Sequence, residues 1–228
     1  AIHAGCRFYA GYPITPQNEI TAHMAERMPE AGGTFIQAES EVAAINMVFG
    51  ASAAGQRAMT SSSSPGISLK QEGISYMVGA ELPGVVINVQ RGGPGLGDIS
   101  PAQGDYFQAT KGGGHGDYHL IVLAPDCVQE MYDFTRLAFD LADKYRTVAM
   151  VIADARVGQL MEPAVFRPAI PPRPAPGWAL TGAEGREKRI VRSFFLEAGL
   201  LPKHNEGLQR KFMAIREAEP RFEEIDLE

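Results

Sequence analysis

Short apolar runs alternate with longer amphipathic segments over about the first 160 residues of the chain. Runs such as "VVINV", "LIVLA" and "TVAMVIAD" show no regular polar alternation. Such runs are typical of strands that are buried on both faces of a parallel sheet. We expect six strands, at Phe8–Ala10, Thr34–Gln37, Arg57–Ser61, Val85–Gln90, Leu120–Ala124 and Val148–Ala153.

Helical periodicity fills most of the intervals between these strands. It predicts helices at Gln17–Met28, Glu41–Ala54, Gly66–Gly79, Asp105–Thr110 and Cys127–Asp143. In the last helix Asp126 is the expected N-cap, and the core-facing stripe consists of Val128, Met131, Thr135, Ala138 and Leu141. The alternation of strands and helices predicts an α/β fold, a doubly wound, mostly parallel sheet with helices on both faces.

The composition changes after the sixth strand. The stretch "EPAVFRPAIPPRPAPGW" is rich in proline, which excludes a packed helix or a central strand. It fits either an extended strap or a disordered linker. Nearer the end, the spacing of Leu208, Phe212 and Ile215 predicts an amphipathic helix. We therefore divide the chain into an α/β domain at 1–160 and, at 161–228, a proline-rich extension with a C-terminal helix.

Charge and composition exclude several classes of function. The chain has 228 residues, a net charge of -6 and a pI near 5.4, which argues against nucleic acid as the main partner. No apolar run approaches the roughly 20 residues of a membrane span, and the first residues do not resemble a signal peptide. The first residue is Ala1 rather than Met, which leaves open that residues precede it. Cys6 and Cys127 cannot alone hold an iron–sulfur cluster, and we expect free thiols in a reducing cytoplasm.

Four loops follow predicted strands, namely "GYPITP" (11–16), "QAESE" (37–41), "TSSSSPG" (60–66) and "QRGGPGLGD" (90–98). In a parallel α/β sheet, ligands bind beyond the carboxyl ends of the strands. We therefore expect the four loops to converge on one edge of the sheet. This convergence indicates a ligand site more strongly than any single motif does.

Two of these loops have stiff, defined turns. In the first, Pro13 and Pro16 fix their own φ angles and restrict the residues before them. Thr15 therefore presents its hydroxyl on a rigid turn, either to a ligand or as an ordinary cap or turn residue. In the third loop, Ser64 as N-cap and Pro65 at the first helical position predict a helix start, whose free amides can polarise a ligand.

The fourth loop carries one cation, Arg91, directly after an apolar strand. Its guanidinium fits bidentate pairing with a substrate carboxylate or, alternatively, an internal salt bridge to Asp98 or Asp105. His115 and His119 lack further ligands at metal spacing. We interpret both as loop or strand-end residues without a metal, of which His115 is the one that could line a ligand site.

The helix after the second loop is apolar nearly all round, which indicates that it is buried. Glu41 opens this helix on the same face as Ile45, Val48 and Ser52, so its carboxyl would be poorly solvated. The simplest interpretation of Glu39 and Glu41 is favourable charge at a helix start. The functional interpretation is a carboxyl that shares a proton with a bound heterocycle.

The loops belong to longer segments that occur in a familiar order. They are "AGCRFYAGYPITPQNEI", "FIQAESEVAAINMVFGASAAG", "TSSSSPGISLKQEGISYMVGAELPGVVINVQRGGPG" and "QGDYFQATKGGGHGDYHLIVLAP". Together they resemble the α-subunit pyrimidine-binding domain of the thiamine diphosphate-dependent 2-oxoacid:ferredoxin oxidoreductases. The resemblance covers about residues 1–160 and is closest to the branched-chain type, which uses 3-methyl-2-oxobutanoate (2-oxoisovalerate); the 2-oxoglutarate type is next.

The resemblance implies an activity and roles for particular residues. The activity would be oxidative decarboxylation of a 2-oxoacid to an acyl-CoA, with reduction of ferredoxin. Glu41, ranked ahead of Glu39, would protonate the aminopyrimidine ring of thiamine diphosphate. Thr15 would donate a hydrogen bond to the substrate, and Arg91 would hold the substrate carboxylate. The other residues implied to contact the cofactor are Pro13, Ile14, Ser64, Pro65 and Gly66.

Some features of the complete enzyme are missing from this sequence. There is no G-D-G followed by paired asparagines for Mg²⁺ and diphosphate, and there is no cysteine cluster. The resemblance therefore implies a β subunit that carries the diphosphate and Mg²⁺ site, together with γ and ferredoxin-like subunits and iron–sulfur clusters on partner chains. This chain alone would be inactive. The α chains of the family usually continue into a second α/β domain, whereas this sequence stops at Glu228, which fits either a truncated or a naturally short form.

Two interpretations of another kind remain open. A subunit that kept the fold and lost the cofactor would be a non-catalytic scaffold, and the presence of Thr15, Glu41 and Arg91 counts against it. A Rossmann-type nucleotide-binding enzyme is disfavoured, because "GGPGLGD" is not a G-x-G-x-x-G motif at a first strand–helix turn.

Overall fold

A computed structural model describes residues 1–222, and the chain divides into one unit at Ala1–Val191 and a second that begins at Arg192. The first unit contains a six-stranded sheet in the order β2-β1-β3-β4-β6-β5, in which every pair is parallel. Each strand begins and ends within one residue of its predicted bounds. The strands are β1 (Phe8–Gly11), β2 (Thr34–Gln37), β3 (Ala58–Ser62), β4 (Gly84–Gln90), β5 (Ile121–Leu123) and β6 (Val148–Asp154).

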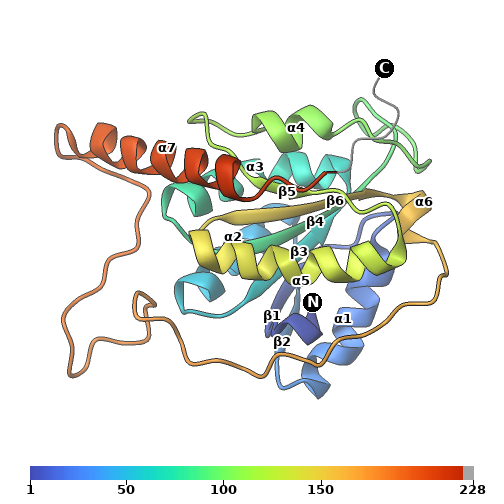
Figure 1. The fold of residues 1–228 in the computed structure, drawn as a ribbon, viewed down its shortest axis with the longest axis horizontal. Coiled ribbons are helices and arrows are strands. Elements are labelled where there is room, and N and C mark those ends of the chain that lie inside the picture. Colours follow the sequence, from blue (N-terminus) through green and yellow to red (C-terminus); the bar gives the residue numbers. More distant parts are fainter. Residues whose placement is uncertain (223–228) are drawn as a thin grey trace. The chain divides into compact units, whose positions relative to one another are not determined.

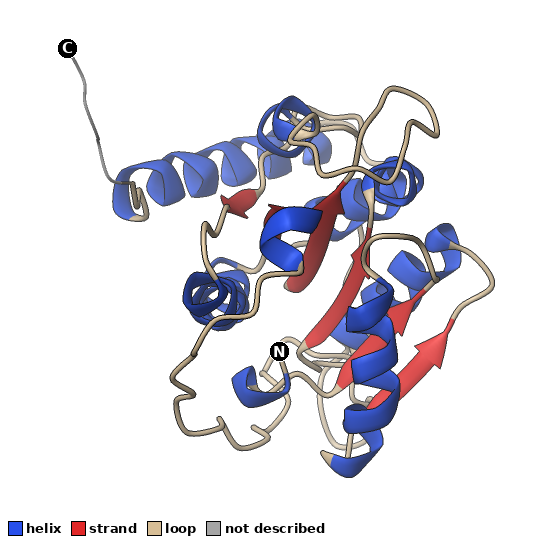
Figure 2. Ribbon diagram, turned by 90° about the vertical axis from the view of Figure 1, so that its right-hand side faces the viewer, coloured by secondary structure: helices blue, strands red, loops and turns tan. Residues whose placement is uncertain are grey.

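Two pairs of helices cover the two faces of this sheet. The connections through α1 (Asn18–Glu30) and α5 (Val128–Tyr145) run toward the β2 end of the strand order, and those through α2 (Glu41–Ala53) and α3 (Ser64–Gly79) run the other way. Because crossovers between parallel strands are right-handed, the two pairs lie on opposite faces (Figures 1 and 2). The predicted doubly wound arrangement is confirmed. The short helices are η1 (Ile2–Ala4), α4 (Tyr106–Lys111) and α6 (Ala155–Gly158).

The centre of the core consists of β4 and β6, in which every residue is buried. This explains why their sequences are mainly apolar and show no regular polar alternation. On one face α2 and α3 pack closely against each other. A Cβ added at Gly73 would lie 2.5 Å from Ile45 Cγ2, so glycine lets the two helix backbones approach. This close packing brings the first turns of α2 and α3 together.

The start of α5 differs from the prediction. Its N-cap is Cys127, and Asp126 lies outside the helix. The amide of Val128 donates instead to the carboxylate of Glu162, at 2.9 Å. The capping acceptor therefore comes from the proline-rich segment, which no local pattern reveals. The predicted core stripe of α5 is buried at Thr135, Ala138 and Leu141 and half-buried at Val128 and Met131.

Within the first unit, the proline-rich segment is an extended strap that lies along η1 and α5 (Figure 1). The Ile170 amide donates to the His3 carbonyl at 2.8 Å. The Tyr132 hydroxyl accepts from the Arg167 amide at 3.0 Å and donates to the Arg167 carbonyl at 3.2 Å. These contacts favour the strap over the linker, whereas the predicted domain division at residue 160 stays a prediction.

The second unit contains the predicted C-terminal helix, α7 (Leu200–Ala218). Leu208 and Phe212, which were predicted to share one face of it, are its buried residues. None of the helices in residues 1–222 combines the length and the apolar character that a membrane span requires.

Candidate active site

The carboxyl ends of β1 and β3 lie side by side in the sheet. From β1 the chain crosses through α1 to β2, and from β3 it crosses through α3 in the opposite direction to β4. This is the topological switch point, the place where open α/β sheets bind ligands. The loops "GYPITP" and "TSSSSPG" leave the sheet here, and "QRGGPGLGD" follows the neighbouring strand β4.

A buried hydrogen-bond network holds the first loop. The Tyr9 hydroxyl lies 2.9 Å from Thr21 Oγ1 and 2.6 Å from Ser61 Oγ. Ser61 also donates to Gln17 Oε1, and Gln17 Nε2 donates to the Tyr12 carbonyl at 3.2 Å. Tyr9, Gln17 and Ser61 are at most 1% exposed, so the network is shielded from water. It anchors the loop to β1, β3 and α1, which explains the rigidity that the prolines suggest.

Arg91 ties the fourth loop to the first. Its Nη1 donates to the Thr15 carbonyl at 3.1 Å, and its Nη2 donates to the Leu96 carbonyl at 2.8 Å. The Nε atom is buried and has no partner in the part of the chain that the structure describes. The guanidinium thus contacts main-chain carbonyls, and the alternative salt bridge to Asp98 or Asp105 is not formed between these described side chains. The Thr15 side chain is exposed at the same place.

Ser64 connects the third and fourth loops. Its hydroxyl donates to Asp105 Oδ2 at 2.6 Å and accepts from the Arg91 amide at 3.1 Å. Because the hydroxyl is engaged in this way, Ser64 does not cap α3. The N-cap is Ser63, Ser64 is the first helical residue, and Pro65 follows in the second position. The prediction for this helix start is therefore wrong by one residue.

Glu41 opens α2 in a buried position, with 7% of its surface exposed. The N-cap Ser40 accepts the Ala43 amide at 3.1 Å, so a local bond fixes this first turn. The carboxyl lies against the start of α3, because a Cβ added at Gly66 would come within 2.8 Å of Glu41 Oε1 and closer still to Ser62 Oγ. Only glycine leaves room for this approach. The structure therefore brings together Glu41 and Gly66, two of the residues predicted to contact the cofactor.

Several buried polar atoms beside these residues have no hydrogen-bond partner among residues 1–222. They are the hydroxyls of Ser62 and Ser63 and the side-chain oxygen of Asn88. Ser62 and Asn88 are neighbours across β3 and β4. Buried polar atoms in native proteins are nearly always hydrogen-bonded. These atoms, at the carboxyl edge where Glu41 and Arg91 also lie, fit a polar ligand that binds there.

Lys70 is a further residue of this cluster that none of the sequence motifs predicts. Its side chain is fully buried in α3, and Nζ donates to the main-chain oxygen of Glu41 at 3.2 Å. Burial lowers the pKa of Lys70 to about 8, and the negative charge of Glu41 opposes this shift. A signal was present in the sequence, since Lys70 lies between Ile67 and Ile74 at helical spacing on the apolar face.

The other predicted site residues are more exposed to solvent or lie away from Glu41 and Gly66. Glu39 and Pro13 are exposed, and Ile14 is half-buried. The His115 ring lies edge-on to Tyr76, near the far end of α3 from Gly66. The structure therefore does not bring His115 to the same edge as Glu41.

One group of side chains in residues 1–222 lies close enough together to share a metal ion. It consists of Asp126, Cys127 and Glu130 at the start of α5. The Asp126 amide donates to the Glu130 carboxylate at 3.1 Å, so part of the group serves the helix start. Exposed acidic groups of this kind are common without a metal, and we assign it no function.

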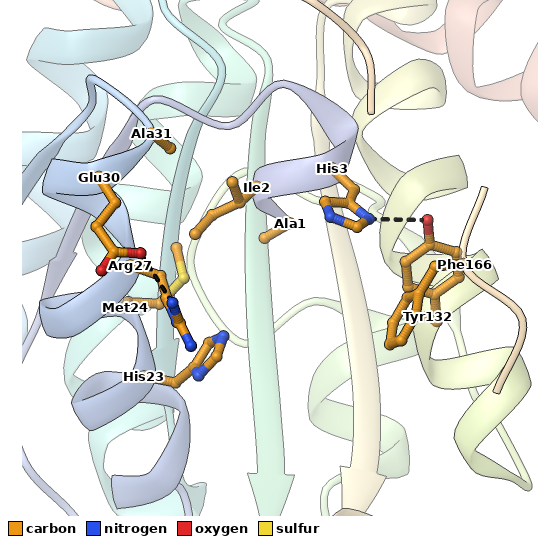
Figure 3. A pocket seen from close by; sticks show the side chains of 10 residues that line it. All are labelled: Ala1, Ile2, His3, His23, Met24, Arg27, Glu30, Ala31, Tyr132 and Phe166. Atoms are coloured by element: carbon orange, nitrogen blue, oxygen red, sulfur yellow. Dashed lines mark hydrogen bonds and ion pairs between the residues drawn. The ribbon is translucent and has the colours of Figure 1, made fainter. Parts of the chain in front are cut away.

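Two cavities lie on the side of the sheet that carries α1 and α5. One of about 520 Å³ is bounded by η1, α1 and α5. Figure 3 shows His3 and Tyr132 on one side of it, and the distance from His3 Nδ1 to the Tyr132 hydroxyl is 3.4 Å. A second, of about 380 Å³, continues over apolar residues of β3 and β4. Neither is lined by Thr15, Glu41 or Arg91. Pro16 of the first loop does line the second cavity, which therefore reaches the residue next to Thr15.

Comparisons with known proteins agree with this arrangement. A family model described as the thiamine diphosphate-binding domain of pyruvate flavodoxin/ferredoxin oxidoreductases matches residues 1–169. The chain is 54% identical over 229 residues to ketoisovalerate oxidoreductase subunit VorB of Methanothermobacter marburgensis, covering 100% of this chain and 65% of that one. It is 52% identical over 167 residues to 2-oxoglutarate synthase subunit KorA of Methanocaldococcus jannaschii, covering 73% of this chain and 45% of that one.

A solved structure shares the fold. It is a 2-oxoglutarate:ferredoxin oxidoreductase from Magnetococcus marinus with 2-oxoglutarate, coenzyme A and succinyl-CoA bound. It matches with a TM-score of 0.81 and 29% identity over 99% of this chain and 45% of that one. The chain thus spans about two thirds of the length of the VorB relative and less than half of the chain in this structure.

Proposed function

Because the chain belongs to the family of thiamine diphosphate-binding domains of pyruvate flavodoxin/ferredoxin oxidoreductases, we propose that it binds the pyrimidine ring of thiamine diphosphate in a multi-subunit 2-oxoacid:ferredoxin oxidoreductase. Relatives named as subunits support an enzyme assembled from several chains. The proposal concerns one part of that enzyme, since the chain spans 65% of the VorB relative.

One observation carries the proposal for this chain. The carboxyl of Glu41 is buried at the switch point, against the start of α3, where Gly66 leaves room for it. Beside it lie serine hydroxyls that have no hydrogen-bond partner among residues 1–222. This arrangement fits a flat heterocycle that offers a ring nitrogen to Glu41 and an amino group to neighbouring oxygens. Burial of a carboxyl costs free energy unless it is hydrogen-bonded, so the buried position of Glu41 favours a ligand that bonds to it.

The residues of this chain would contribute placement and control of protons. Thiamine diphosphate, when bound, supplies the nucleophilic carbon and the electron sink for decarboxylation of a 2-oxoacid. Glu41 shares a proton with the ring nitrogen and thereby controls the basicity of the ring. Thr15 donates a hydrogen bond from its anchored turn, and Arg91 pairs with the substrate carboxylate through its guanidinium edge. Misplacement of such groups by about 1 Å can cost on the order of 100-fold in rate.

The remaining chemistry belongs to partner chains in this proposal. A β subunit holds the diphosphate and Mg²⁺, and further subunits carry the iron–sulfur clusters that pass electrons to ferredoxin. Coenzyme A receives the acyl group. We place the enzyme in the cytoplasm, which agrees with the free thiols of Cys6 and Cys127.

We propose 3-methyl-2-oxobutanoate as the preferred substrate. The 54% identity to a ketoisovalerate oxidoreductase subunit extends over the whole chain, whereas the match to a 2-oxoglutarate synthase subunit covers 73% of it. The second candidate is 2-oxoglutarate, because the KorA relative is nearly as similar where it aligns. The two substrates differ in their side chains, a branched alkyl group in one and a second carboxylate in the other, so the side-chain pocket decides this choice rather than the shared site.

The test is co-purification of the tagged chain with its partners, followed by assay with coenzyme A and a viologen dye. We expect the dye to be reduced fastest with 3-methyl-2-oxobutanoate. A preference for 2-oxoglutarate would support the second candidate. Absence of reduction with any 2-oxoacid, together with no heat on titration with thiamine diphosphate, would show a non-catalytic scaffold instead.

A further inference from the structure

Asp105 precedes the short helix α4 as its N-cap residue, but its side chain does not cap that helix. An aspartate at an N-cap ordinarily accepts amides of its own helix, and this side chain forms no such bond within residues 1–222. Its Oδ2 atom instead accepts the Ser64 hydroxyl at 2.6 Å and the Asn88 side-chain amide at 2.9 Å. The Asp105 amide also donates to Gln90 Oε1 at 2.9 Å. Asp105 therefore binds α3 and β4, which carry part of the candidate site, rather than its own helix.

The Ser64 hydroxyl connects Asp105 to Arg91. A hydroxyl has one proton and a carboxylate can only accept, so the proton of Ser64 is donated to Asp105. A lone pair of the same oxygen then accepts the Arg91 amide at 3.1 Å. The Arg91 carbonyl lies 3.4 Å from Ser64 Oγ, too far to compete for the proton with a bond of 2.6 Å. The hydrogen bonds therefore run in one direction, from the Arg91 amide through Ser64 to Asp105.

These bonds hold the main chain from which the Arg91 side chain starts. Arg91 is the first residue after β4, and its guanidinium donates to the carbonyls of Thr15 and Leu96 in two loops. The bond from its amide to Ser64 ties it to the start of α3. Glu41 lies against the same helix start. The link from Arg91 to Asp105 therefore helps to set the position of the guanidinium relative to Glu41, where we place the cofactor ring.

We propose that Asp105 is a positioning residue for the 2-oxoacid, which holds Ser64 so that Arg91 presents its guanidinium to the substrate carboxylate. This inference rests on the proposed function, and it assigns Asp105 no contact with the substrate. Without the Asp105 carboxylate, the Ser64 proton turns to the Arg91 carbonyl, and the bond to the Arg91 amide loses its geometry. The guanidinium then moves with its main chain, and misplacement of such a group by about 1 Å can cost on the order of 100-fold in rate.

The inference predicts a rise in KM for the 2-oxoacid without an equal fall in kcat. The substrate carboxylate is bound alike before and during the reaction, so weaker binding of this group acts on KM. In Asp105→Ala we expect KM to rise by about tenfold, while kcat stays within about threefold of the wild type. Asp105→Asn keeps a side-chain oxygen that can accept from both donors, and it should retain KM to within about threefold.

The experiment is steady-state oxidation of 3-methyl-2-oxobutanoate by the assembled complex, saturated with thiamine diphosphate, Mg²⁺ and coenzyme A, with a viologen dye as the electron acceptor. Ser64→Ala removes the link and leaves the carboxylate, and a variant with both alanines completes a double-mutant cycle. Because Asp105 acts through Ser64, the double variant should show the same KM as each single variant rather than a multiplied rise. Glu72→Ala is the control, because it removes an exposed negative charge from the same helix, α3, and its KM should equal that of the wild type.

A binding measurement without turnover accompanies the kinetics. Isothermal titration of the complex uses 2-hydroxy-3-methylbutanoate, which keeps the carboxylate and the branched side chain but has no keto group for the cofactor to attack. Its affinity should fall by about tenfold in Asp105→Ala, in parallel with the rise in KM. Thermal unfolding of each complex, measured alongside, shows how far the loss of Asp105 acts on stability.

Each outcome decides the inference. A KM in Asp105→Ala that equals the wild-type value overturns it even where the melting temperature falls, because a merely structural aspartate gives that result. A rise in KM that Asp105→Asn shares in full also overturns it, since the charge and not the hydrogen bonds would then matter. Rises that multiply in the double variant exclude a route through Ser64. If Asp105→Ala does not assemble, the KM of Ser64→Ala decides alone. Absence of dye reduction by the wild-type complex with any 2-oxoacid would overturn the proposed function itself, which separates the two failures.

Discussion

Replacement of Gly66 by alanine tests whether the position of Glu41 matters to the cofactor. The added Cβ would lie 2.8 Å from Glu41 Oε1 and 2.9 Å from its Cγ, well inside the roughly 3.5–4.0 Å that suits non-bonded contacts. The start of α3 and the carboxyl cannot both keep their places. Because Ser62 Oγ is closer still, the methyl group cannot escape to that side, and the carboxyl of Glu41 must move.

Two magnitudes follow from this overlap. Overpacking a well-filled site costs about 1–3 kcal/mol, and the better helix propensity of alanine returns about 1 kcal/mol. The net loss of about 0–2 kcal/mol would lower the melting temperature by a few degrees for a chain of this size. A displacement of the carboxyl by about 1 Å should cost far more in function, on the order of 100-fold. Cofactor affinity should therefore fall by at least about tenfold in a protein that still folds.

The assay is titration of the assembled complex with thiamine diphosphate, with thermal unfolding measured in parallel. Gly50→Ala is the matched control, because Gly50 lies in the same buried helix α2 and an added Cβ there meets nothing within 4 Å. It should raise stability by about 0.5–1 kcal/mol and leave affinity unchanged. A Gly66→Ala complex that binds the cofactor as well as the Gly50→Ala complex would refute the placement of the ring beside Glu41.

Three further predictions address other parts of the account. In Arg91→Lys the contacts to two loop carbonyls cannot both form. The KM for the 2-oxoacid should therefore rise by about tenfold or more in steady-state assays, while cofactor affinity stays near that of the wild type. An unchanged KM would show that Arg91 does not bind the substrate. Tyr9→Phe deletes a hydroxyl that has two buried partners. It should lower the free energy of unfolding by about 1–3 kcal/mol in denaturant titrations. A loss below about 0.5 kcal/mol would show that the network does not anchor the first loop. The folded-state pKa of Lys70 is lowered to about 8 from its ordinary value of 10.5, so its buried charge costs stability below pH 8 and the cost disappears between these values. Wild type should therefore gain up to about 3 kcal/mol relative to Lys70→Met as the pH rises through that window, and a constant difference between the two would contradict the burial of a charged lysine.

The architecture was largely predictable because its signals are local. Buried parallel strands favour apolar runs, and β4 and β6 are apolar except for Asn88 and Gln90 in β4 and Asp154 at the end of β6. Glycine and proline mark the loops between elements. Convergence of the loops at one edge follows from parallel topology alone, which is why Thr15, Glu41, Ser64 and Arg91 could be grouped before their contacts were known.

The contacts that the sequence did not predict join segments that are distant along the chain. The capping acceptor for α5 comes from Glu162, 34 positions from the amide that it binds. Arg91 bonds to main-chain carbonyls, and every residue type carries such groups. Lysines are almost never fully buried unless they are paired, so the place of Lys70 on the apolar face of α3 does not by itself establish that it is buried. The main-chain oxygen that Lys70 binds belongs to Glu41 on another helix, so this contact emerges only once α2 and α3 are packed.

The most direct test of the central claim is the rate of 2-oxoacid oxidation by the assembled complex that carries Glu41→Gln. Glutamine keeps the size and the helix start but has no acidic proton to share with the cofactor ring. Glu39→Gln is the control, because Glu39 is exposed in the same loop. We predict that the Glu41 variant loses more than about tenfold in rate, as removal of a proton-transfer group usually does, while the Glu39 variant stays within about twofold of the wild type. A Glu41→Gln complex that retains its rate to within about tenfold would contradict the account.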